Sequence, residues 1–365
     1  MSETDENINM SNATFQCMNC GASLKYKPGT TFLHCDYCNT DTPIDIKPVE
    51  EVVELDFEKY AGAYEEINLK ATKIIGCRKC GAESTFDENT KSIACPYCNT
   101  PLIESDAHEE RLIQASYILP FHIADDCVNE HLHKWLKSLW FAPNKLKRRA
   151  MQTDQLQGLY IPCWTYDAQT ETSYTGKRGD TYTVTVGSGN NKRTEIRTRW
   201  TYCSGNVSLF FDDIMVSASK HINQALLDQV SGGGGWDTIN MVEADNRFLS
   251  GFSTEKYTTN LRDGFNTAKR VINDRIDSKI RYDIGGDKQQ IDSKDTKITD
   301  IKFKLILLPV YISSYTYKNK LYSFYMNGRN GNITGSRPYS TIKIILAIIA
   351  GLLAIAGIYY LYTQQ

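Results

Sequence analysis

The chain has 365 residues, of which 41% are hydrophobic, and its formal net charge at pH 7 is −2. This length can hold one sizeable domain beside smaller elements. A nearly neutral charge balance excludes a global electrostatic attraction to nucleic acid.

Two copies of one four-cysteine pattern lie near the N-terminus, sixty residues apart. Each reads Cys-x2-Cys-x14-Cys-x2-Cys, a spacing that presents four thiolates tetrahedrally and suits Zn²⁺. Two disulfides or a redox pair in each unit are the alternative, but they do not explain a repeat in register with the same Gly-Ala and Tyr-Cys-Asn-Thr flanks. We predict zinc ribbons at 14–42 and 73–103, with two structural Zn²⁺ ions held by Cys17, Cys20, Cys35, Cys38, Cys77, Cys80, Cys95 and Cys98.

A ribbon of about thirty residues buries little core, so the metal must supply most of its folding free energy, on the order of 10 kcal/mol. Four cysteine ligands leave no open position for substrate, which argues against catalysis at either metal. The second ribbon repeats the apolar filling of the first, with Phe86, Ser92 and Ile93 in the places of Tyr26, Phe32 and Leu33.

Each ribbon resembles a known class. The segment Cys20-Gly21-Ala22-Ser23-Leu24-Lys25-Tyr26 is similar to the zinc fingers named after the plant lesion-simulating protein. The second ribbon resembles the ribbons of general transcription factor B and of rubredoxin-like proteins. Both resemblances imply zinc and leave the function open.

The linker between the ribbons, 43–72, is acidic. From Asp41 to Lys70 it carries nine carboxylates against three lysines. We expect a solvated spacer with a short helix from Glu58 to Asn68. The alternative is a partner-binding linker that uses the apolar residues Val52, Val53, Leu55 and Phe57.

The main domain, 113–338, has the patterns of an α+β fold. Helical spacing predicts helices at Asp126–Trp140 and Glu255–Arg281. Alternation predicts a strand pair at Tyr182–Val186 and Thr194–Tyr202, and later strands at Phe303–Tyr317 and Leu321–Met326. The run Gly232–Gly235 is expected to be a loop, because no Gly-Lys-Ser/Thr follows it. We therefore predict a strongly curved antiparallel sheet with helices.

The segment 342–362 is predicted to be a transmembrane helix. Ile344 to Leu361 contains no charged residue and would be roughly 27 Å long as a helix, about the thickness of the hydrocarbon layer. Basic residues precede the span and none follows it, which favours a cytoplasmic body. Met1–Met10 has no apolar run of a signal peptide. We expect a tail-anchored, single-pass protein of the inner (cytoplasmic) membrane.

Three segments of the main domain resemble those of one protein family. They are Leu159-Tyr160-Ile161-Pro162-Cys163-Trp164-Thr165-Tyr166-Asp167-Ala168 with Tyr174-Thr175-Gly176, Phe248-Leu249-Ser250-Gly251-Phe252 with Glu255-Lys256-Tyr257, and Leu308-Pro309-Val310-Tyr311 with Asn327-Gly328 and Gly331 to Gly335. With the ribbons and the span, the chain is similar to bacterial zinc-ribbon membrane proteins that are often labelled as relatives of the primosomal replication helicase. Tyr311 and Cys163 depart from the family, which usually has Trp and a Phe-like residue there.

The resemblance implies association with envelope-stress systems that contain phage-shock-like and flotillin-like proteins. It brings no set of catalytic residues. The helicase label itself is not supported by the sequence. A helicase motor needs a phosphate-binding loop, and the nearest candidate, Gly187 to Lys192, lacks the required spacing.

Catalytic constellations are missing from the sequence. His131 and His133 are two residues apart on a predicted helix, so they point to different faces. Asp212-Asp213 has the composition of a turn, and the three remaining cysteines are expected to be small buried hydrophobic residues, namely Cys127, Cys163 and Cys203. We predict that the protein is not an enzyme.

The sequence therefore predicts a membrane-anchored scaffold whose zinc ribbons dock other proteins. The alternative is a nucleic-acid-binding protein tethered to the membrane. Its cationic candidates are the ribbon residues Lys25, Lys27, Arg78 and Lys79. A further stripe of Arg193, Arg197 and Arg199 on one strand could contact anionic lipid or an acidic partner, although a solvated strand face also explains it.

Overall fold

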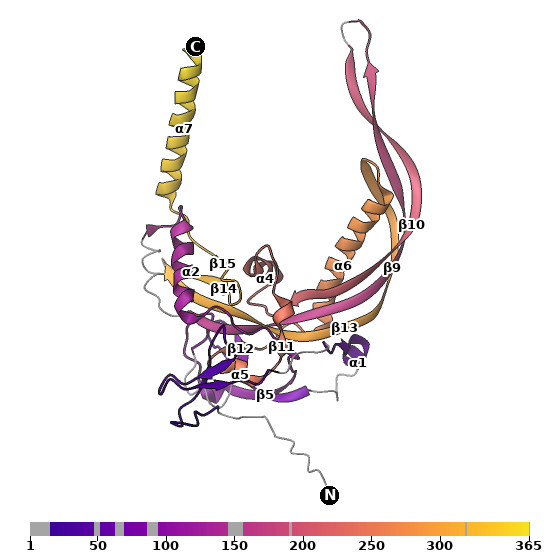
Figure 1. The fold of residues 1–365 in the computed structure, drawn as a ribbon. Helices are drawn as coiled ribbons and strands as arrows, with labels where there is room; N and C mark the ends of the chain where they lie inside the picture. The colour runs from indigo at the N-terminus through magenta and orange to yellow at the C-terminus, as the bar shows by residue number, and fades with distance from the viewer. Residues whose placement is uncertain are drawn as a thin grey trace.

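The computed structural model describes residues 15–46, 52–62, 69–85, 94–144, 156–189, 192–317 and 320–364. It shows an α+β protein with a sheet-rich body, two groups of four cysteines near the N-terminus, and one apolar helix near the C-terminus (Figure 1). The sequence predictions for Met1–Met10 and for Phe86, Ser92 and Ile93 lie outside the described residues.

Three long strands organise the body. β9 (Gln157–Val186) lies between β10 (Arg193–Ser217) and β13 (Lys288–Tyr317) and pairs antiparallel with both. These strands curve strongly, as the sequence analysis expected (Figure 1). They are much longer than the predicted ones, because alternation is visible only where one face is wet, and β9 is buried on both faces over its first half.

Two irregularities bend the sheet at one level. The register of β10 shifts between Phe211 and Ile214, and that of β13 shifts between Thr299 and Lys302. Asp213 and Asp300 adopt φ values of 50° and 51° at these points. An extra residue in one strand increases twist and bending. Asp212-Asp213, expected to be a turn, thus belongs to a bulge inside β10.

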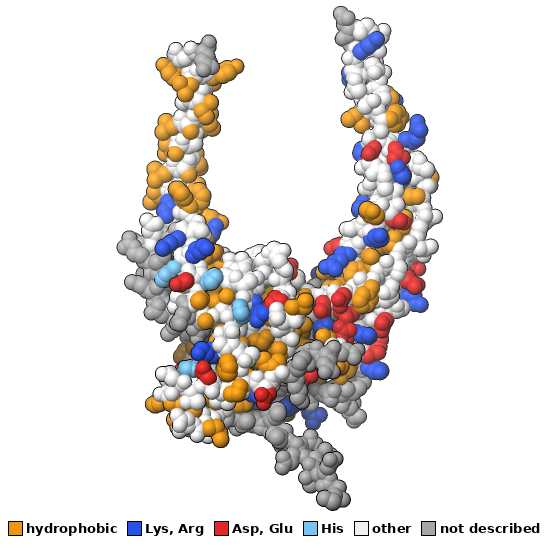
Figure 2. Space-filling model, in the orientation of Figure 1, with side chains coloured by type: hydrophobic (Ala, Val, Ile, Leu, Met, Phe, Trp, Pro, Cys, Tyr) orange, Lys and Arg blue, Asp and Glu red, His pale blue; other side chains and the backbone are white. Residues whose placement is uncertain are grey.

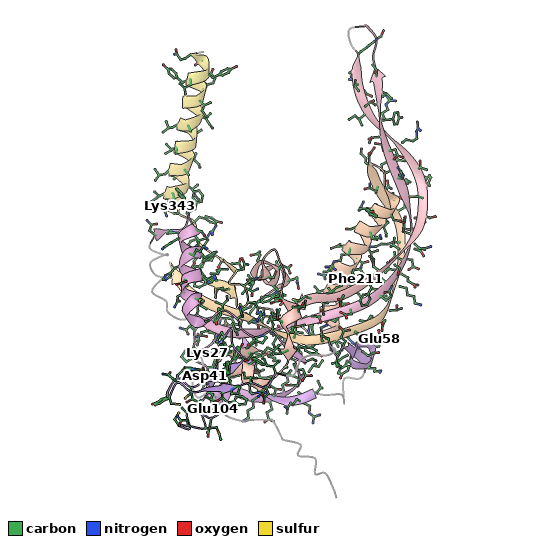
Figure 3. The ribbon with its side chains drawn as sticks, viewed as in Figure 1. Lys27, Asp41, Glu58, Glu104, Phe211 and Lys343 are labelled. Carbon is green, nitrogen blue, oxygen red and sulfur yellow. The ribbon has the colours of Figure 1, made fainter. Side chains whose placement is uncertain are left out.

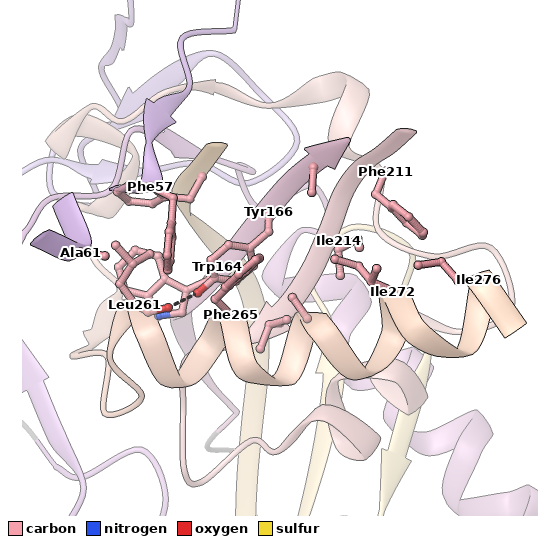
Figure 4. Packing of buried hydrophobic residues seen from close by; sticks show 14 of the residues in the cluster. Phe57, Ala61, Trp164, Tyr166, Phe211, Ile214, Leu261, Phe265, Ile272 and Ile276 are labelled. Carbon is pink, nitrogen blue, oxygen red and sulfur yellow. Dashed lines mark hydrogen bonds between the residues drawn. The ribbon is translucent and has the colours of Figure 1, made fainter. Parts of the chain in front are cut away.

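The helix α6 (Leu261–Ile284) covers the concave face of the sheet (Figures 1 and 4). It begins at Leu261 and not at Glu255, because the side chain of Asn260 caps it by accepting a hydrogen bond of 2.8 Å from the amide of Asp263. Its buried stripe has the predicted helical spacing and consists of Leu261, Gly264, Phe265, Ala268, Ile272, Ile276, Ile280 and Ile284.

The helix α2 (Asp125–Ser138) confirms the first predicted helix of the main domain. It packs beside β14 (Lys320–Asn327) and β15 (Ile333–Gly335), which follow β13. The shared core contains Leu132, Leu136, Leu139, Ala142, Tyr315 and Phe324. The C-terminal helix α7 (Thr341–Thr363) starts next to the end of α2.

The two cysteine units join the body differently. The first forms its own sheet of β1 (Lys25–Tyr26), β2 (Phe32–His34) and β3 (Asp41–Pro43). The second unit contributes β5 (Leu69–Gly76) and β6 (Glu83–Thr85) to the large sheet. There β12 (Ser253–Glu255) lies between β6 and β9, and β7 (Ala107–Ile113) pairs with the other edge of β5.

Part of the acidic linker is docked on the body. β4 (Leu55–Asp56) pairs with β13, and α1 (Phe57–Gly62) places Phe57 against Tyr166 and Phe265. Phe57 is buried, so the prediction of a solvated spacer is wrong for this part, although Val53 is exposed. The linker residues 47–51 and 63–68 lie outside the described residues.

Short elements complete the body. Gly232, directly after α4 (Gln224–Ser231), has a φ of +75° and ends that helix. The run Gly232–Gly235 is therefore a loop, as predicted. The short elements are two 3₁₀ turns (Glu104–Asp106 and Thr238–Asn240), β8 (Tyr117–Ile118), α4 (Gln224–Ser231), β11 (Val242–Glu243) and α5 (Asn246–Leu249).

The close contact of α6 with β9 depends on Gly264. A Cβ atom at this position would collide with the ring and hydroxyl of Tyr166 and would lie 2.9 Å from Trp164 Cδ1. We expect Gly264→Val to lower the free energy of unfolding by about 2 kcal/mol, because overpacking displaces these rings. Asp274→Val, at an exposed position of the same helix, is the control and should cost only about 0.5 kcal/mol. Urea unfolding measures both, and an equal loss would contradict the predicted packing.

Candidate metal centres and membrane anchor

Each predicted ligand set forms one compact group of sulfur atoms. In both units, the four Sγ atoms lie within 4.8 Å of one another. The shortest pairs are 3.5 Å apart in the first unit and 3.4 Å apart in the second. A tetrahedral site with Zn–S near 2.3 Å has S···S distances of about 3.8 Å. All eleven cysteines are free, which gives the disulfide alternative no support.

The backbone of each unit folds into two matching turns. In the first unit, the amide of Gly21 donates to the carbonyl of Cys17 over 2.8 Å, and the amide of Asn39 donates to that of Cys35 over 2.9 Å. Gly21 and Asn39 have positive φ values of 75° and 54°. Gly81 and Asn99 repeat the arrangement in the second unit, with φ values of 75° and 55°.

The sequence analysis noted the repeated flanks and missed the role of the asparagine in this turn. Asn is one of the few residues other than Gly that adopts the left-handed conformation readily. The repeated Cys-Asn-Thr was the signal that could have revealed it. The threonine matters as well, because the hydroxyl oxygens of Thr40 and Thr100 lie 3.1 Å from Cys38 Sγ and Cys98 Sγ.

These hydroxyl groups favour the thiolate form, which is the form that binds metal. The contact with Thr40, together with those of the other three thiols, lowers the pKa of Cys38 to about 6. A backbone hydrogen bond at Ala22 lowers the pKa of Cys20, but Cys38 and Cys35 raise it, and the pKa is raised overall, so Cys38 is the more readily ionised of the two. Burial raises the pKa of Cys98, but the contact with Thr100 acts in the opposite direction, and the pKa is lowered to about 7. The two cysteine groups can therefore hold metal ions such as zinc.

The two units differ in burial. Cys77, Cys95 and Cys98 lie in a core cluster together with residues of β9 and β13. The hydroxyl of Tyr97, between two cysteines of this unit, donates to the buried carboxylate of Glu255 over 2.6 Å, and its ring stacks on His221 at 4.5 Å. The second unit is thus part of the body.

The first unit also packs on the body, because Cys17 and Cys35 lie in a core cluster with Tyr160 of β9 and Tyr311 of β13. The amide of Tyr26 donates to the carbonyl of Ser250, and the amide of Gly29 donates to that of Phe121. The Tyr26 ring packs edge-on against Phe248. The other side of the unit faces solvent, since Met18 and Tyr37 are 97% and 89% exposed.

A buried lysine forms a charged cluster that the sequence analysis missed. Lys304 is 2% exposed, and its ammonium group contacts the carboxylates of Glu54 at 2.8 Å and Asp213 at 2.5 Å. Burial and the neighbouring Glu54 carboxyl raise the pKa of Asp167 to about 7. Glu54, Asp167 and Asp213 lie close enough together to hold a metal ion, but Lys304 already supplies a positive charge among them. The cluster fastens the linker to the bulge, and a lone Lys in the apolar run after Phe303 was its signal.

The other singled-out residues form no further metal group within the described part of the chain. His131 Nδ1 lies 2.9 Å from the carbonyl oxygen of Cys127, one turn earlier on α2. Cys163 is buried as expected, and burial raises the pKa of its thiol. Cys203 is half-buried, whereas Cys127 is exposed, so the expectation of a buried side chain is wrong there.

The helix α7 is long and apolar enough to cross a membrane. It has 23 residues, a mean hydropathy of 2.6 over its most apolar window, and no part of that window buried. Figure 2 shows apolar side chains along its visible face, separate from the body. A helix of this length spans roughly 35 Å. The structure thus contains a candidate membrane anchor.

The start of α7 is tied to the end of α2. Ser340 caps α7 by accepting a hydrogen bond from the amide of Lys343. The Lys343 ammonium group donates to the carbonyl oxygens of Trp140 and Ala142, over 3.1 Å and 2.9 Å. A cation is favourable where helix carbonyl groups end. Figure 3 shows Lys343 at the base of α7, with Lys27, Asp41 and Glu104 farther from that helix, near the ribbons.

Loss of one metal site should affect stability unequally. We expect Cys95→Ser and Cys20→Ser each to reduce bound zinc from two ions to one per chain, because three cysteines hold zinc more weakly. Cys95→Ser should also lower the Tm by roughly 10 °C, since Cys95 is buried in a core cluster with body residues whereas Cys20 is exposed. Metal analysis and thermal unfolding of the full chain provide the measurement. Equal melting temperatures for the two variants would contradict the predicted asymmetry.

Glu255 should make stability depend on pH. Burial raises its pKa from 4.5 to about 7, although hydrogen bonds from Tyr97 and Ser219 lower it. The folded protein therefore binds this proton more tightly than the unfolded chain, so the contribution of Glu255 to stability is fully present below pH 4.5 and is lost as the pH rises toward 7. Glu255→Gln should remove about 3 kcal/mol of this decrease.

The measurement is the free energy of unfolding of wild type and Glu255→Gln between pH 4.5 and 8. Other titrating groups cancel in the difference between the two proteins. A difference that stays constant with pH would show that Glu255 keeps an ordinary pKa.

Comparison with known proteins gives one distant relative. No family model matches the chain, and no solved structure matches it. The chain is 24% identical over 335 residues to the uncharacterized protein YdjG of Bacillus subtilis (strain 168). The similarity covers 91% of this chain and 92% of that protein, so the two are related over nearly their whole length.

Proposed function

We propose that this protein is a non-enzymatic scaffold anchored in the cytoplasmic membrane. In this proposal, α7 crosses the membrane once and the body lies in the cytoplasm. Each cysteine group holds one structural Zn²⁺ ion. The second ribbon stabilises the body, and the first ribbon docks a protein partner.

The observation that carries the proposal is the unequal use of two matching ribbons. Tyr97 of the second ribbon is buried, whereas Tyr37, at the same position of the first, is 89% exposed. Met18, in the other cysteine turn of the first ribbon, is 97% exposed. Tyrosine and methionine are common in protein-binding surfaces, because they offer large apolar contacts. An exposed pair on metal-stiffened turns is suited to docking.

The charges of the ribbons favour a protein partner over nucleic acid. Lys25 pairs with Asp36 at 2.7 Å, Lys27 approaches Asp41 at 3.8 Å, and Arg78 contacts Asp106. Cations that already have acidic partners gain less from phosphate groups. The membrane-tethered nucleic-acid-binding protein therefore remains the weaker alternative.

The location follows from α7 and its flanks. Arg329 and Arg337 precede the helix and Lys343 lies in its first turn, and basic residues are enriched on the cytoplasmic side of membrane spans, which supports a cytoplasmic body. The ribbons lie at the end of the molecule away from α7, where a cytoplasmic partner could reach them (Figures 1 and 3). The family resemblance suggests flotillin-like or phage-shock-like proteins as partners.

Docking by the first ribbon predicts a loss of partners without a loss of zinc. Met18→Ala combined with Tyr37→Ala should remove the partners that wild type retains, because both side chains are exposed and neither binds metal. The measurement is affinity purification from detergent-solubilised membranes, with and without nuclease, followed by mass spectrometry. Ile239→Ala with Tyr282→Ala, at positions that are 92% and 81% exposed elsewhere, is the matched control.

We expect the same partners from wild type and control, unchanged by nuclease, and their loss from the ribbon variant. Partners that disappear with nuclease would favour the nucleic-acid alternative. Retention of all partners by the ribbon variant would contradict docking at Met18 and Tyr37.

A further inference from the structure

The β9–β10 hairpin ends in an arm that leaves the body. We define the arm as residues 177–202. Pairing of β13 with β9 stops at Lys288 and Gly179, and α6 ends at Ile284. Beyond this point the described residues of the arm form only a two-stranded ribbon. Figure 1 shows that the arm projects to the same side of the body as α7.

The arm concentrates positive charge in a chain that is slightly acidic overall. It contains six basic residues, Lys177, Arg178, Lys192, Arg193, Arg197 and Arg199, and two acidic ones, Asp180 and Glu195. Both acidic residues already pair with arginines of the arm. Glu195 contacts Arg193 at 2.8 Å and Arg197 at 3.3 Å, and Asp180 contacts Arg178 at 3.1 Å. The single Glu195 carboxylate is shared by two arginines and can neutralise only one of them, so the arm keeps an excess of four positive charges for an anionic surface.

Large side chains lie on both faces of the arm. Tyr182 shares the face of Arg193, Arg197 and Arg199, whereas Ile196, Trp200 and Tyr202 alternate onto the opposite face. The side chains of Tyr202 and Ile196 are 80% and 74% exposed, and those of Trp200 and Tyr182 are 43% and 42% exposed. Lys177 lies over the ring of Tyr202, and Arg199 lies over that of Tyr182. Tryptophan, tyrosine and basic side chains are the residues that membrane interfaces favour.

The place of the arm relative to α7 restricts where it can lie. In Figure 1, α6 ends at about the height at which α7 begins, so the arm emerges at the level of the lipid headgroups if α7 crosses the membrane. The hydrocarbon layer cannot accept the arm, because a two-stranded ribbon exposes unpaired backbone groups along both edges. Its arginines add a further cost there. The headgroup layer has no such restriction.

We propose that the arm lies along the anionic headgroups of the membrane that anchors α7, with Arg193, Arg197 and Arg199 as its main contacts. This inference rests on the membrane anchor proposed above. The arm must bend away from the direction of α7, and the end of α6 near Gly179 is where a third strand and a helix stop supporting it. Anchor and arm together hold the body in one orientation at the membrane.

The test compares the full chain in vesicles of phosphatidylcholine with vesicles that contain about one third phosphatidylglycerol. Hydrogen–deuterium exchange of the arm amides is the readout. We expect exchange to slow by about tenfold or more only in the anionic vesicles, because bound headgroups restrict opening of the ribbon. Resistance of the protein to alkaline carbonate extraction tests the anchor separately.

The variant Arg193→Gln/Arg197→Gln/Arg199→Gln should lose this protection. Each cation contributes roughly a fivefold effect near an anionic surface, so three lower the binding constant of the arm on the order of 100-fold. The control Arg270→Gln/Arg275→Gln/Lys279→Gln changes the charge equally at exposed positions of α6 and should keep the protection.

Protection that is equal in both kinds of vesicle, or that survives in the arm variant, would overturn the proposal. Absence of protection in a carbonate-resistant protein would overturn the arm contact and leave the anchor intact. Release by carbonate would overturn the anchor and with it the arm contact. Stronger protection by a single-stranded oligonucleotide than by anionic vesicles would identify the arm as a nucleic-acid surface instead.

Discussion

The pairing of β9 with a long strand on each side is the interaction on which the rest of the structure depends. A strand paired on both edges has its backbone groups satisfied, so its side chains can be buried on both faces. One face of β9 carries Trp164 and Tyr166 into the cluster with α6. The other carries Leu159 and Ile161 into the cluster with the second ribbon. The helix and the metal centre are thus packed on opposite sides of one strand.

This arrangement explains why two equivalent ribbons have different surroundings. Metal coordination needs the same two turns in both, and the hydrogen bonds and positive φ values repeat almost without change. The surroundings are not constrained by the metal. Tyr97 is buried in the body, where its hydroxyl group donates a hydrogen bond to Glu255. Tyr37 has no such hydrogen bond among the described residues and is exposed. Both ribbons pack on the body, but the first leaves Met18 and Tyr37 exposed to solvent.

Buried charge limits how far the body can rearrange. Lys304 is enclosed by carboxylates that come from the linker and from the bulge of β10. Removing one partner of a buried ion pair is strongly destabilising, because the remaining charge is left uncompensated. Lys304 thereby holds Glu54 in place, and with it the described part of the linker, although the linker looks like a solvated acidic segment in the sequence. Composition alone cannot reveal a partner that is 250 residues away.

The sequence by itself determined the local features: the two cysteine groups, the apolar helix α7, the helix α2 and the buried stripe of α6. Each depends on spacing within a few turns of chain, so neighbouring residues contain the information. Only the tertiary structure decided the true length of β9 and β13, the burial of Tyr97 and Lys304, and the projection of the arm to the same side of the body as α7. These features come from pairings between distant segments. The segments around Trp164 and Phe303 cannot be recognised as parts of long strands from the sequence, because burial on both faces removes the alternation that would mark a strand.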